Sequence, residues 1–414
     1  MKRWFAIVAL FISSLPALAQ GSAPAQQQAV IRPGDNLVIE NLPPVPAAIA
    51  ERANQYGEFR GAGLLDWDPQ RLEMLISTRF ADVPQIHRVK MPGGARTQLT
   101  FFPDRTAGAH YGPKSDYFVF GKDVGGGEWF QLYRYDLVSG NITLLTDGKS
   151  RNTGPAWSHN ADRIAYSSTR RTGQDTDIWT MDPRDPKTDH LLLQLEGGGW
   201  GANDWSPDNK KLLVSQGVSA NQSYIWLADA TTGEKKLLTP KVGDQEIAYG
   251  DALFSKDAKG FYTTTDRDSE FQRLAYFDFA AMKPEYLTTD IKWDVDEFVL
   301  SDDGKTIAFV TNEDGISKLY LMDTATRKYR PVAGIPAGLI GGIRFHKNNH
   351  DLAFVLTSAR STSDVYSLNV STNKLERWTF SETGGLNTAS FAEPQLIKWK
   401  TFDGKTISGF LYSP

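Results

Sequence analysis

Apolar segments recur along the chain, and each ends at an aromatic or bulky apolar residue followed by a polar turn. Several of these turns read Ser-Pro-Asp or Ser-Asp-Asp-Gly, and the residues that precede the turns are Trp67, Tyr111, Trp157, Trp205, Phe254, Leu300 and Phe345. Successive copies of this first anchor lie 44, 46, 48, 49, 46 and 45 residues apart. Self-similarity at such a period is typical of a repeat architecture.

A second anchor has the pattern apolar-aromatic-x-apolar-Asp and ends 23 to 25 residues after the first. Its copies are spaced by 46, 46, 47, 49, 45 and 46 residues. They occupy Leu132–Asp136, Ile178–Asp182, Ile225–Asp229, Leu274–Asp278, Leu319–Asp323, Val365–Asn369 and, least clearly, Ile86–Lys90. Two independent anchors that agree on one period make a chance pattern a poor explanation.

Each repeat unit has the residue pattern of β-strands. Runs such as Ile164–Ser167 and Leu212–Ser215 are short, apolar and bounded by turn residues, which is typical of buried strands. Many units also end in a residue pair such as Leu238-Thr239. About four strands in each unit predict an all-β fold, a propeller of about seven four-stranded blades over residues 59–380. We expect the anchor aromatics to pack between blades rather than to form a cofactor box or a stacking platform.

The polar turns have a local cause. Ser and Asp side chains bond backbone N–H groups two residues on, and Gly supplies the positive φ that a tight hairpin needs.

The first residues differ from the repeat. Met1-Lys2-Arg3 is basic, Trp4–Ile12 is apolar, and Ala17-Leu18-Ala19 is a small-x-small ending, so residues 1–19 read as a secretory signal peptide. The apolar run is too short for a transmembrane helix, which needs about 20 residues. We therefore expect export, to the periplasm or the outside, and no membrane span.

An N-terminal extension is expected over residues 20–58. Residues 20–35 are rich in Gln, Ala and Pro. The apolar run Leu37–Ile39 predicts a short strand. A short helix is expected over Val45–Tyr56, with Pro46 in its first turn. One face of this helix is an apolar stripe, which we expect to pack against another part of the protein.

Composition excludes several classes. The 414 residues include 45 Lys+Arg and 49 Asp+Glu, a net charge of −4, and 40 % are hydrophobic. This balance excludes wholesale disorder and argues against a general nucleic-acid binder. The chain has no Cys, which excludes disulfides, a thiolate nucleophile and a thiolate metal site.

Residues 381–414 end in a predicted β-hairpin. Asp403-Gly404 lies between Leu396–Phe402 and Lys405–Tyr412, and an Asp-Gly pair between two strand-like runs is a strong hairpin signal. An isolated hairpin with so many apolar side chains is marginal in water. We expect it to need a further layer of structure and the sequence to be a piece of a longer protein.

The propeller followed by Trp399–Pro414 resembles the prolyl oligopeptidase family of serine peptidases, within it the acylaminoacyl-peptidase-like exported branch. The segment Arg79–Val89, with Pro92–Ala95 and Gln98–Thr100, is similar to the first blade of that branch. The resemblance implies that the hairpin opens an α/β-hydrolase domain, so 381–414 would be a linker and the start of that domain. It also implies peptide hydrolysis by Ser-His-Asp chemistry in the full-length parent, with short peptides as substrates. The propeller would filter those substrates by size.

No catalytic, cofactor-binding or metal-binding residue is assigned, and no cofactor is expected. The sequence lacks the G-x-S-x-G turn that presents a nucleophilic Ser, the nearest match being Gly217–Asn221. The six His are expected mostly in solvated turns: His87, His110, His159, His190, His346 and His350. The triple-Gly segments at 125–127 and 197–199 and the acidic segments 294–297 and 302–303 read as loops, and Arg170-Arg171 as part of a surface ion-pair cluster with Asp175 and Asp177.

Two other functions stay open. A stand-alone periplasmic propeller similar to the TolB type would act as a protein-interaction module, although such proteins carry their extra domain before the propeller. A propeller enzyme, such as a lyase or glycosidase, would need His or carboxylate side chains that converge at the inner strands. The repeat positions are expected to show no such set.

Overall fold

The computed structural model describes residues 29–32 and 34–413, which belong to two compact units, Met1–Gly57 and Glu58–Pro414. The predicted signal peptide, residues 1–19, lies outside the described residues, so the signal peptide and export stay predictions. Within the described part of the chain, no helix has the length and apolar character to cross a membrane.

The first unit contains the short helix α1, Ala47–Gly57, which confirms the expected element and starts one residue after Pro46. Val30 pairs with Pro46 as a single antiparallel bridge. The prediction of a strand at Leu37–Ile39 is wrong, since these residues belong to no strand. An apolar run of three residues forms a strand only where a neighbouring strand can satisfy its backbone N–H and C=O groups.

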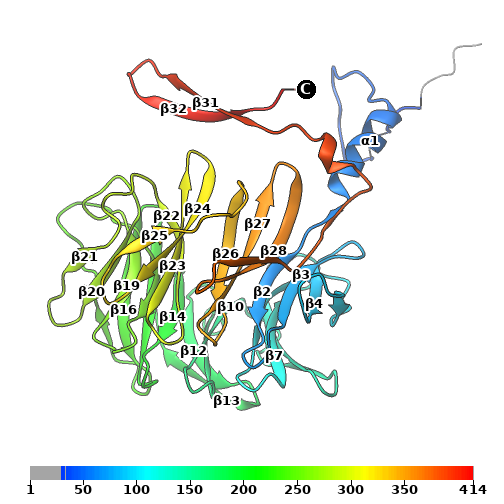
Figure 1. The fold of residues 1–414 in the computed structure, drawn as a ribbon. Helices are drawn as coiled ribbons and strands as arrows, with labels where there is room; N and C mark the ends of the chain where they lie inside the picture. Colours follow the sequence, from blue (N-terminus) through cyan, green and yellow to red (C-terminus); the bar gives the residue numbers. More distant parts are fainter. Residues whose placement is uncertain (1–28, 33, 414) are drawn as a thin grey trace, which may run out of the picture. The chain divides into compact units, whose positions relative to one another are not determined.

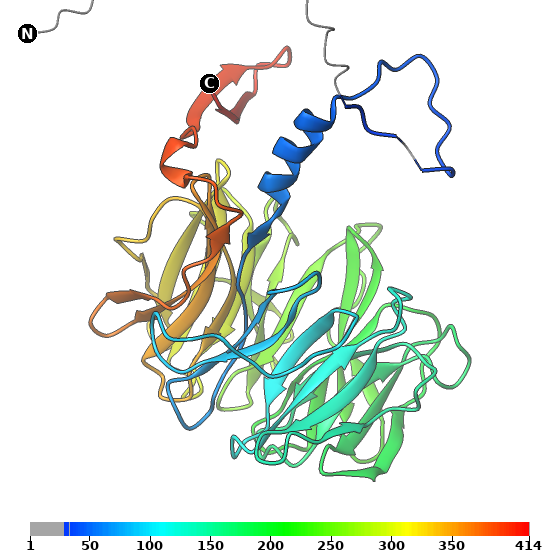
Figure 2. The same ribbon diagram turned by 90° about the vertical axis from the view of Figure 1, so that its right-hand side faces the viewer.

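The second unit contains seven four-stranded antiparallel sheets, each built from four consecutive strands (Figures 1 and 2). The predicted fold class, an all-β propeller of seven blades, is confirmed. We number the blades in chain order.

The strands of the blades have the following bounds. Blade 1 holds β2 (Gly63–Trp67), β3 (Met74–Thr78), β4 (Gln85–Val89) and β5 (Thr97–Gln98). Blade 2 holds β6 (Thr106–Tyr111), β7 (Tyr117–Lys122), β8 (Gln131–Asp136) and β9 (Ile142–Leu144). Blade 3 holds β10 (Asn152–Trp157), β11 (Ile164–Ser168), β12 (Asp177–Asp182) and β13 (Asp185–Leu193). Blade 4 holds β14 (Trp200–Trp205), β15 (Lys211–Ser219), β16 (Gln222–Asp229) and β17 (Lys235–Leu237).

The remaining blades follow the same order. Blade 5 holds β18 (Tyr249–Phe254), β19 (Gly260–Thr265), β20 (Arg273–Asp278) and β21 (Pro284–Tyr286). Blade 6 holds β22 (Val295–Leu300), β23 (Thr306–Glu313), β24 (Ile316–Asp323) and β25 (Tyr329–Pro331). Blade 7 holds β26 (Leu339–Phe345), β27 (Asp351–Ser358), β28 (Ser361–Asn369) and β29 (Lys374–Arg377). The first anchor therefore ends the first, inner strand of every blade, and the second anchor lies on the third strand.

The Thr that ends many units has a structural role. Its hydroxyl accepts a hydrogen bond from a backbone N–H on the third strand of the same blade, 14 residues earlier, at 2.8–3.1 Å. The Thr residues are Thr100, Thr146, Thr239, Thr288 and Thr379. The side chain thus continues the ladder beyond the short fourth strand, which satisfies a buried donor.

The turns after the inner strands follow the predicted chemistry with two corrections. In blade 4, Asp208 accepts the N–H of Lys210, but Ser206 accepts from Lys211, five residues on, and donates to Asp208. Gly occupies the positive-φ position of this turn in blade 6, where Gly304 has φ +73°, whereas the other blades use residues such as Asn209. Asn adopts this region more readily than other non-Gly residues, which accounts for Asn209 and Asn349, whereas Ser115, Ala161 and Ala258 take the position in blades 2, 3 and 5 without that advantage.

Blades 1 and 7 close the ring without sharing a strand. The Trp67 indole N–H donates to the Arg344 carbonyl at 3.1 Å, and the Ala62 N–H donates to the Ser363 carbonyl at 2.8 Å. Trp67 also packs edge-on against Trp378 at 5.4 Å between ring centroids, within a cluster drawn from both blades. Closure therefore depends on apolar packing and a few hydrogen bonds.

The connections into and out of the propeller pair with each other. Strand β1, Phe59–Arg60, forms a two-stranded sheet with β30, Glu382–Thr383, and an Arg60–Glu382 ion pair of 3.1 Å joins them. The short 3₁₀ helix Thr388–Ser390 follows β30. Entry and exit therefore lie on the same face of the propeller.

The predicted C-terminal hairpin is confirmed as β31, Gln395–Lys400, paired with β32, Thr406–Leu411. It touches the turn between β23 and β24, where Lys398 Nζ lies 2.6 Å from Asp314 Oδ2 and the Phe410 ring packs close to Gly315. We call this face of the propeller, which carries the turns between second and third strands, the hairpin face.

Candidate functional site

Every inner strand is interrupted by a shift in register shortly before its anchor residue. The shifts lie between Leu64 and Asp66 in blade 1, between Ala202 and Asp204 in blade 4, and at the corresponding place in the other five blades. Such bulges bend a strand and redirect a side chain. They bring polar side chains of several blades to the central channel.

The channel contains a cavity of about 510 Å³ lined by residues from the inner strands of blades 2 to 7. Its polar side chains are those of His110, Asn203, Asp251 and Arg344. Most of the remaining wall is apolar and includes Pro155, Trp157, Leu253, Phe298, Val299 and Ile343. A neighbouring cavity of about 220 Å³ shares His110, Trp157 and Arg344 and adds Asp66, Lys347 and several turn residues. The two cavities lie at the end of the channel opposite the hairpin face, since the anchor residues end the inner strands there.

Three carboxylates bond the inner strands of neighbouring blades. Asp66 accepts the Tyr111 N–H at 2.8 Å, and Asp204 accepts the Phe254 N–H at 2.8 Å. Glu297 accepts the N–H groups of Gly342 and Ile343 at 2.8 and 3.0 Å. These bonds satisfy backbone N–H groups of the inner strands, which in blade 7 lie within the bulge, so the carboxylates have a structural role.

Burial changes the ionisation of these groups. It raises the pKa of Asp66, against the opposing effect of Arg344. It also raises the pKa of Glu297, where nearby Asp251 adds to the rise and the two backbone donors and Arg344 oppose it. The pKa of Asp204 is raised to about 7 by burial, against the opposing hydrogen bond from Phe254.

Arg344 connects three blades inside the channel. Its Nη1 lies 3.4 Å from Asp66 Oδ1 and 3.4 Å from His110 Nδ1. Burial, with the adjacent Arg344 charge, lowers the pKa of His110 to about 3, so the imidazole is neutral at pH 7. Because a guanidinium only donates, Nδ1 must accept and the proton lies on Nε2.

The channel also corrects one prediction about candidate residues. The His residues are not mostly solvated: His87 is fully buried on β4, His110 lines the channel, and His346 is buried and donates to the Asp68 carbonyl. At the inner strands Asp66 and His110 both approach Arg344, a pairing that the repeat positions did not indicate, while the expectation that no catalytic set converges there stays a prediction. Asp66, His110, Asp204 and Arg344 each directly precede a first anchor, and that position is the signal that reveals them.

The other candidates have structural explanations. Arg171 forms ion pairs with Asp175 and with buried Asp177 at 3.2 and 2.9 Å, and Arg170 pairs with Asp189, which confirms the predicted ion-pair cluster. Among residues 29–32 and 34–413, no group of three His, Asp or Glu side chains is arranged to hold a metal ion.

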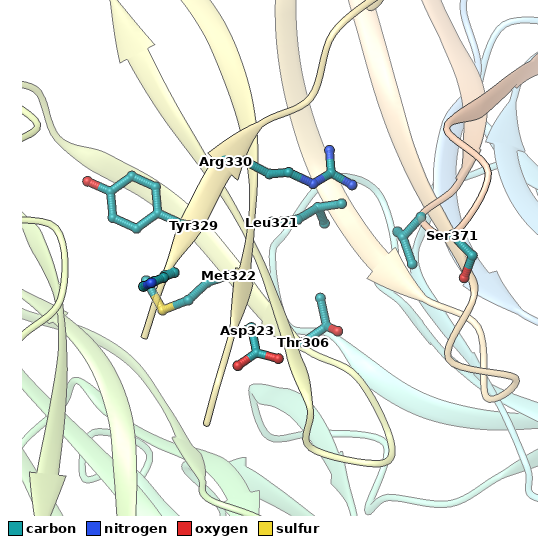
Figure 3. A pocket seen from close by; sticks show the side chains of 9 residues that line it. Thr306, Leu321, Met322, Asp323, Tyr329, Arg330 and Ser371 are labelled. Atoms are coloured by element: carbon teal, nitrogen blue, oxygen red, sulfur yellow. The ribbon is translucent and has the colours of Figure 1, made fainter. Parts of the chain in front are cut away.

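Two further grooves lie outside the channel. One of about 390 Å³ runs between blades 6 and 7, and Figure 3 shows Ser371 facing Thr306 and Leu321 across it. The other, of about 430 Å³, lies on the hairpin face beside Trp129 and Arg151.

The raised pKa of Asp204 predicts that Asp204→Asn is more stable than the parent at pH 8. The folded chain holds a proton that the unfolded chain releases, so the free energy of unfolding falls as pH rises from about 4 towards 7. An Asn amide oxygen still accepts from Phe254 and cannot ionise. At about 1.4 kcal/mol per pKa unit the gain is on the order of a few kcal/mol at pH 8 and vanishes near pH 4. Urea unfolding at pH 4, 6 and 8 measures it.

Asp208→Asn is the matched control for this prediction. The hydrogen bond from Ser206 holds the pKa of Asp208 below its usual value, so the free energy of unfolding of this variant does not rise above that of the parent at pH 8. A loss of stability at pH 8 in Asp204→Asn would contradict the burial argument.

Comparison with known proteins agrees with the fold. The family model for the prolyl oligopeptidase N-terminal β-propeller domain matches residues 106–381. No curated protein sequence matches the chain. Solved structures with the same fold include a prolyl endopeptidase (16% identity, TM-score 0.71), prolyl oligopeptidase B from Galerina marginata (12%, 0.69) and a puromycin hydrolase (16%, 0.68).

These structures are longer than the present chain. The matches cover 88%, 88% and 87% of this chain but only 56%, 56% and 59% of the three structures, in the same order. The match to the family model spans well over half of the 414 residues. The chain therefore belongs to the prolyl oligopeptidase family, of which it carries the N-terminal β-propeller domain.

Proposed function

We propose that this chain is the non-catalytic, substrate-gating domain of an exported serine peptidase. An α/β-hydrolase domain, which the hairpin β31–β32 begins, carries the catalytic triad and hydrolyses short peptides. The acylaminoacyl-peptidase-like branch, the signal peptide and a periplasmic or extracellular location belong to the same proposal.

The exposed apolar surface of the hairpin is the observation that carries the proposal. Trp399, Phe402 and Tyr412 are 46%, 106% and 57% exposed, and Leu396, Ile407 and Leu411 are each at least 40% exposed. Trp399, Ile407 and Leu411 share one face of the hairpin in this register, and exposed apolar surface of this kind marks an interaction site. A two-stranded hairpin also needs a partner layer for stability. A hydrolase domain packed on the hairpin supplies that layer.

The pairing of β1 with β30 supports the gating role. Entry and exit strands lie together on the hairpin face, so a domain that continues from the hairpin sits over that end of the channel. A propeller in that position admits short flexible peptides and excludes folded proteins, and it confines the reaction. The stand-alone TolB-like module is less well supported, because the family match favours the peptidase reading.

The isolated 414-residue chain is expected to hydrolyse no peptide, because G-x-S-x-G is absent from its sequence. Chromogenic peptide substrates measure this, and turnover abolished by a serine-directed reagent would overturn the proposal. The coding sequence after the codon for Pro414 provides the second test. We expect it to continue into a G-x-S-x-G motif followed by Asp and His, and a stop codon there would favour a stand-alone module.

A further inference from the structure

We propose that the central channel binds a short apolar peptide with free termini, with its carboxylate at Arg344 and its ammonium group at Asp251. The inference deepens the proposed function and rests on it for the choice of a peptide as ligand. The chemistry of the site is derived from the channel wall alone.

The shape and polarity of the cavity fit such a ligand. A cavity of about 510 Å³ is in the range of small-molecule sites, which are mostly apolar with a few placed polar groups. A sphere of this volume is about 10 Å across, and an extended dipeptide spans about 7 Å. Leu253, Phe298 and Ile343 offer the apolar wall for its side chains.

Arg344, the cationic side chain of the cavity wall, has unused donor capacity. The contacts of Arg344 with Asp66 and His110 both use Nη1 and are long at 3.4 Å. In the part of the chain that the structure describes, the other guanidinium nitrogens of Arg344 donate to no group, and its side chain is 40% exposed. A carboxylate can take a bidentate pair of bonds from such a guanidinium. The Nε2–H of neutral His110 adds a third donor at the same wall.

Two buried polar atoms in the cavity wall lack partners among the described residues: the indole N–H of Trp157 and Asn203 Oδ1. Trp157 differs in this from the anchor tryptophans of blades 1 and 4, since the indole N–H groups of Trp67 and Trp205 donate to the preceding blade. An unsatisfied buried donor or acceptor is costly for the folded state. Both atoms are covered by the surrounding wall and do not face the cavity, so they take no part in the proposed binding.

The acidic side chain of the cavity wall is Asp251. Its exposed side chain lines the cavity from blade 5, and in the described residues it makes no hydrogen bond or ion pair, unlike Asp66, Asp204 and Glu297. Its negative charge helps to raise the pKa of Glu297 of blade 6. Asp251 is therefore the carboxylate left to pair with a ligand ammonium group.

The test is calorimetric titration of the 414-residue chain with the dipeptide Leu-Phe, its C-terminal amide and its N-acetyl derivative. We expect saturable binding of Leu-Phe at one site, and binding at least tenfold weaker for each blocked peptide. Asp251→Asn should weaken Leu-Phe about tenfold but leave the N-acetyl peptide unchanged. Arg344→Gln should weaken Leu-Phe and leave the amide unchanged.

Asp244→Asn, a change at an exposed carboxylate away from the cavity, is the matched control and should leave every affinity unchanged. Three results would overturn the proposal. They are the absence of saturable binding at peptide concentrations up to 20-fold above 1 mM, equal affinities for the free and blocked peptides, and a loss of affinity in Asp244→Asn equal to that in Asp251→Asn. Thermal melting identifies a variant that fails to fold. If Arg344→Gln fails, the affinity of Asp251→Asn for Leu-Phe decides the test, because Asp251 makes no hydrogen bond or ion pair among the described residues. Binding is measured without hydrolysis, so its failure leaves the peptidase proposal to be judged by the sequence after Pro414.

Discussion

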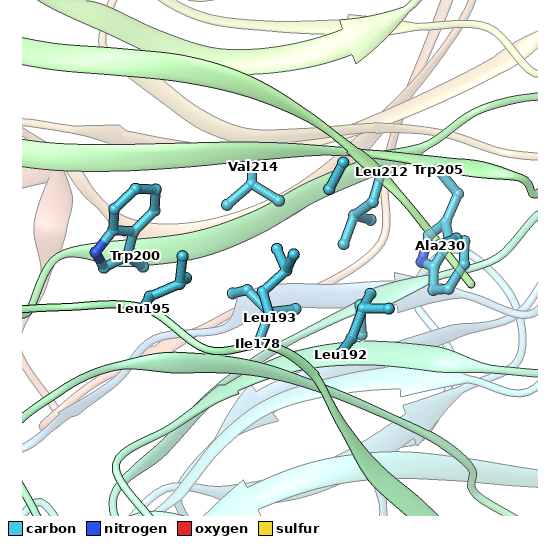
Figure 4. Close-up of a cluster of buried hydrophobic side chains, with 11 residues drawn as sticks. Ile178, Leu192, Leu193, Leu195, Trp200, Trp205, Leu212, Val214 and Ala230 are labelled. Carbon is cyan, nitrogen blue, oxygen red and sulfur yellow. The ribbon is translucent and has the colours of Figure 1, made fainter. Parts of the chain in front are cut away.

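Trp205→Ala is expected to lower the free energy of unfolding by about 3–5 kcal/mol, the usual cost of truncating a buried aromatic side chain. Trp205 is fully buried between blades 3 and 4, and Figure 4 shows it beside Leu212 and Ala230 at one end of the apolar cluster. Its indole N–H donates to the Ala156 carbonyl at 3.1 Å, so the substitution also removes a bond between blades. Urea unfolding followed by far-UV circular dichroism measures the loss.

Two variants separate the parts of this effect. Trp205→Phe keeps most of the apolar contact and loses the N–H, so we expect a loss of about 1–3 kcal/mol from the unpaired carbonyl and the smaller ring. Trp129→Ala, at a side chain that is 51% exposed, should stay within about 0.5 kcal/mol of the parent. Equal losses in Trp205→Ala and Trp129→Ala would mean that the anchor does not hold neighbouring blades together.

The repeat could be predicted from sequence because each anchor has the same structural role in every blade. Aromatics such as Trp205 fill the space between sheets, and Thr such as Thr239 bonds the third strand, so selection of one residue type at one place leaves a period in the chain. The hairpin β31–β32 was predictable for a local reason, the Asp403-Gly404 turn.

The channel could not be predicted in the same way, because its polar residues differ from blade to blade. Asp66, His110, Asp204 and Arg344 occupy equivalent positions but carry different charges, so the position has no period in residue type. Their partners lie on other blades: Arg344 contacts Asp66, 278 residues away in sequence. The bulges that turn these side chains inward also depend on strand pairing, which a single strand does not reveal.

One buried carboxylate lies at the end of blade 7, close to the junction of blades 1 and 7. Asp364, on blade 7, is fully buried and accepts from Arg377 at 2.6 Å and from Thr379 and Ser381 at 2.7 Å each. Ser381 directly precedes β30, so this carboxylate fixes the last strand of blade 7 and the start of the connection that pairs with β1. It therefore supports the exit segment that pairs with β1, while the direct contacts between blades 1 and 7 are those of Trp67 and Ala62.

Asp364→Ala is therefore expected to lower the free energy of unfolding by about 3–5 kcal/mol, since removing one partner leaves the Arg377 charge uncompensated in a partly buried site. Glu376→Ala, three residues before Thr379, breaks the exposed Lys374–Glu376 pair and should change stability by less than about 1 kcal/mol. Asp364→Asn keeps an acceptor for Ser381 and Thr379 and should fall between the two. Urea unfolding ranks the three variants, and limited proteolysis should cut Asp364→Ala faster than Glu376→Ala between residues 381 and 395. Equal stability of Asp364→Ala and Glu376→Ala would show that the seam is held by the apolar packing of Trp67 and Trp378 alone.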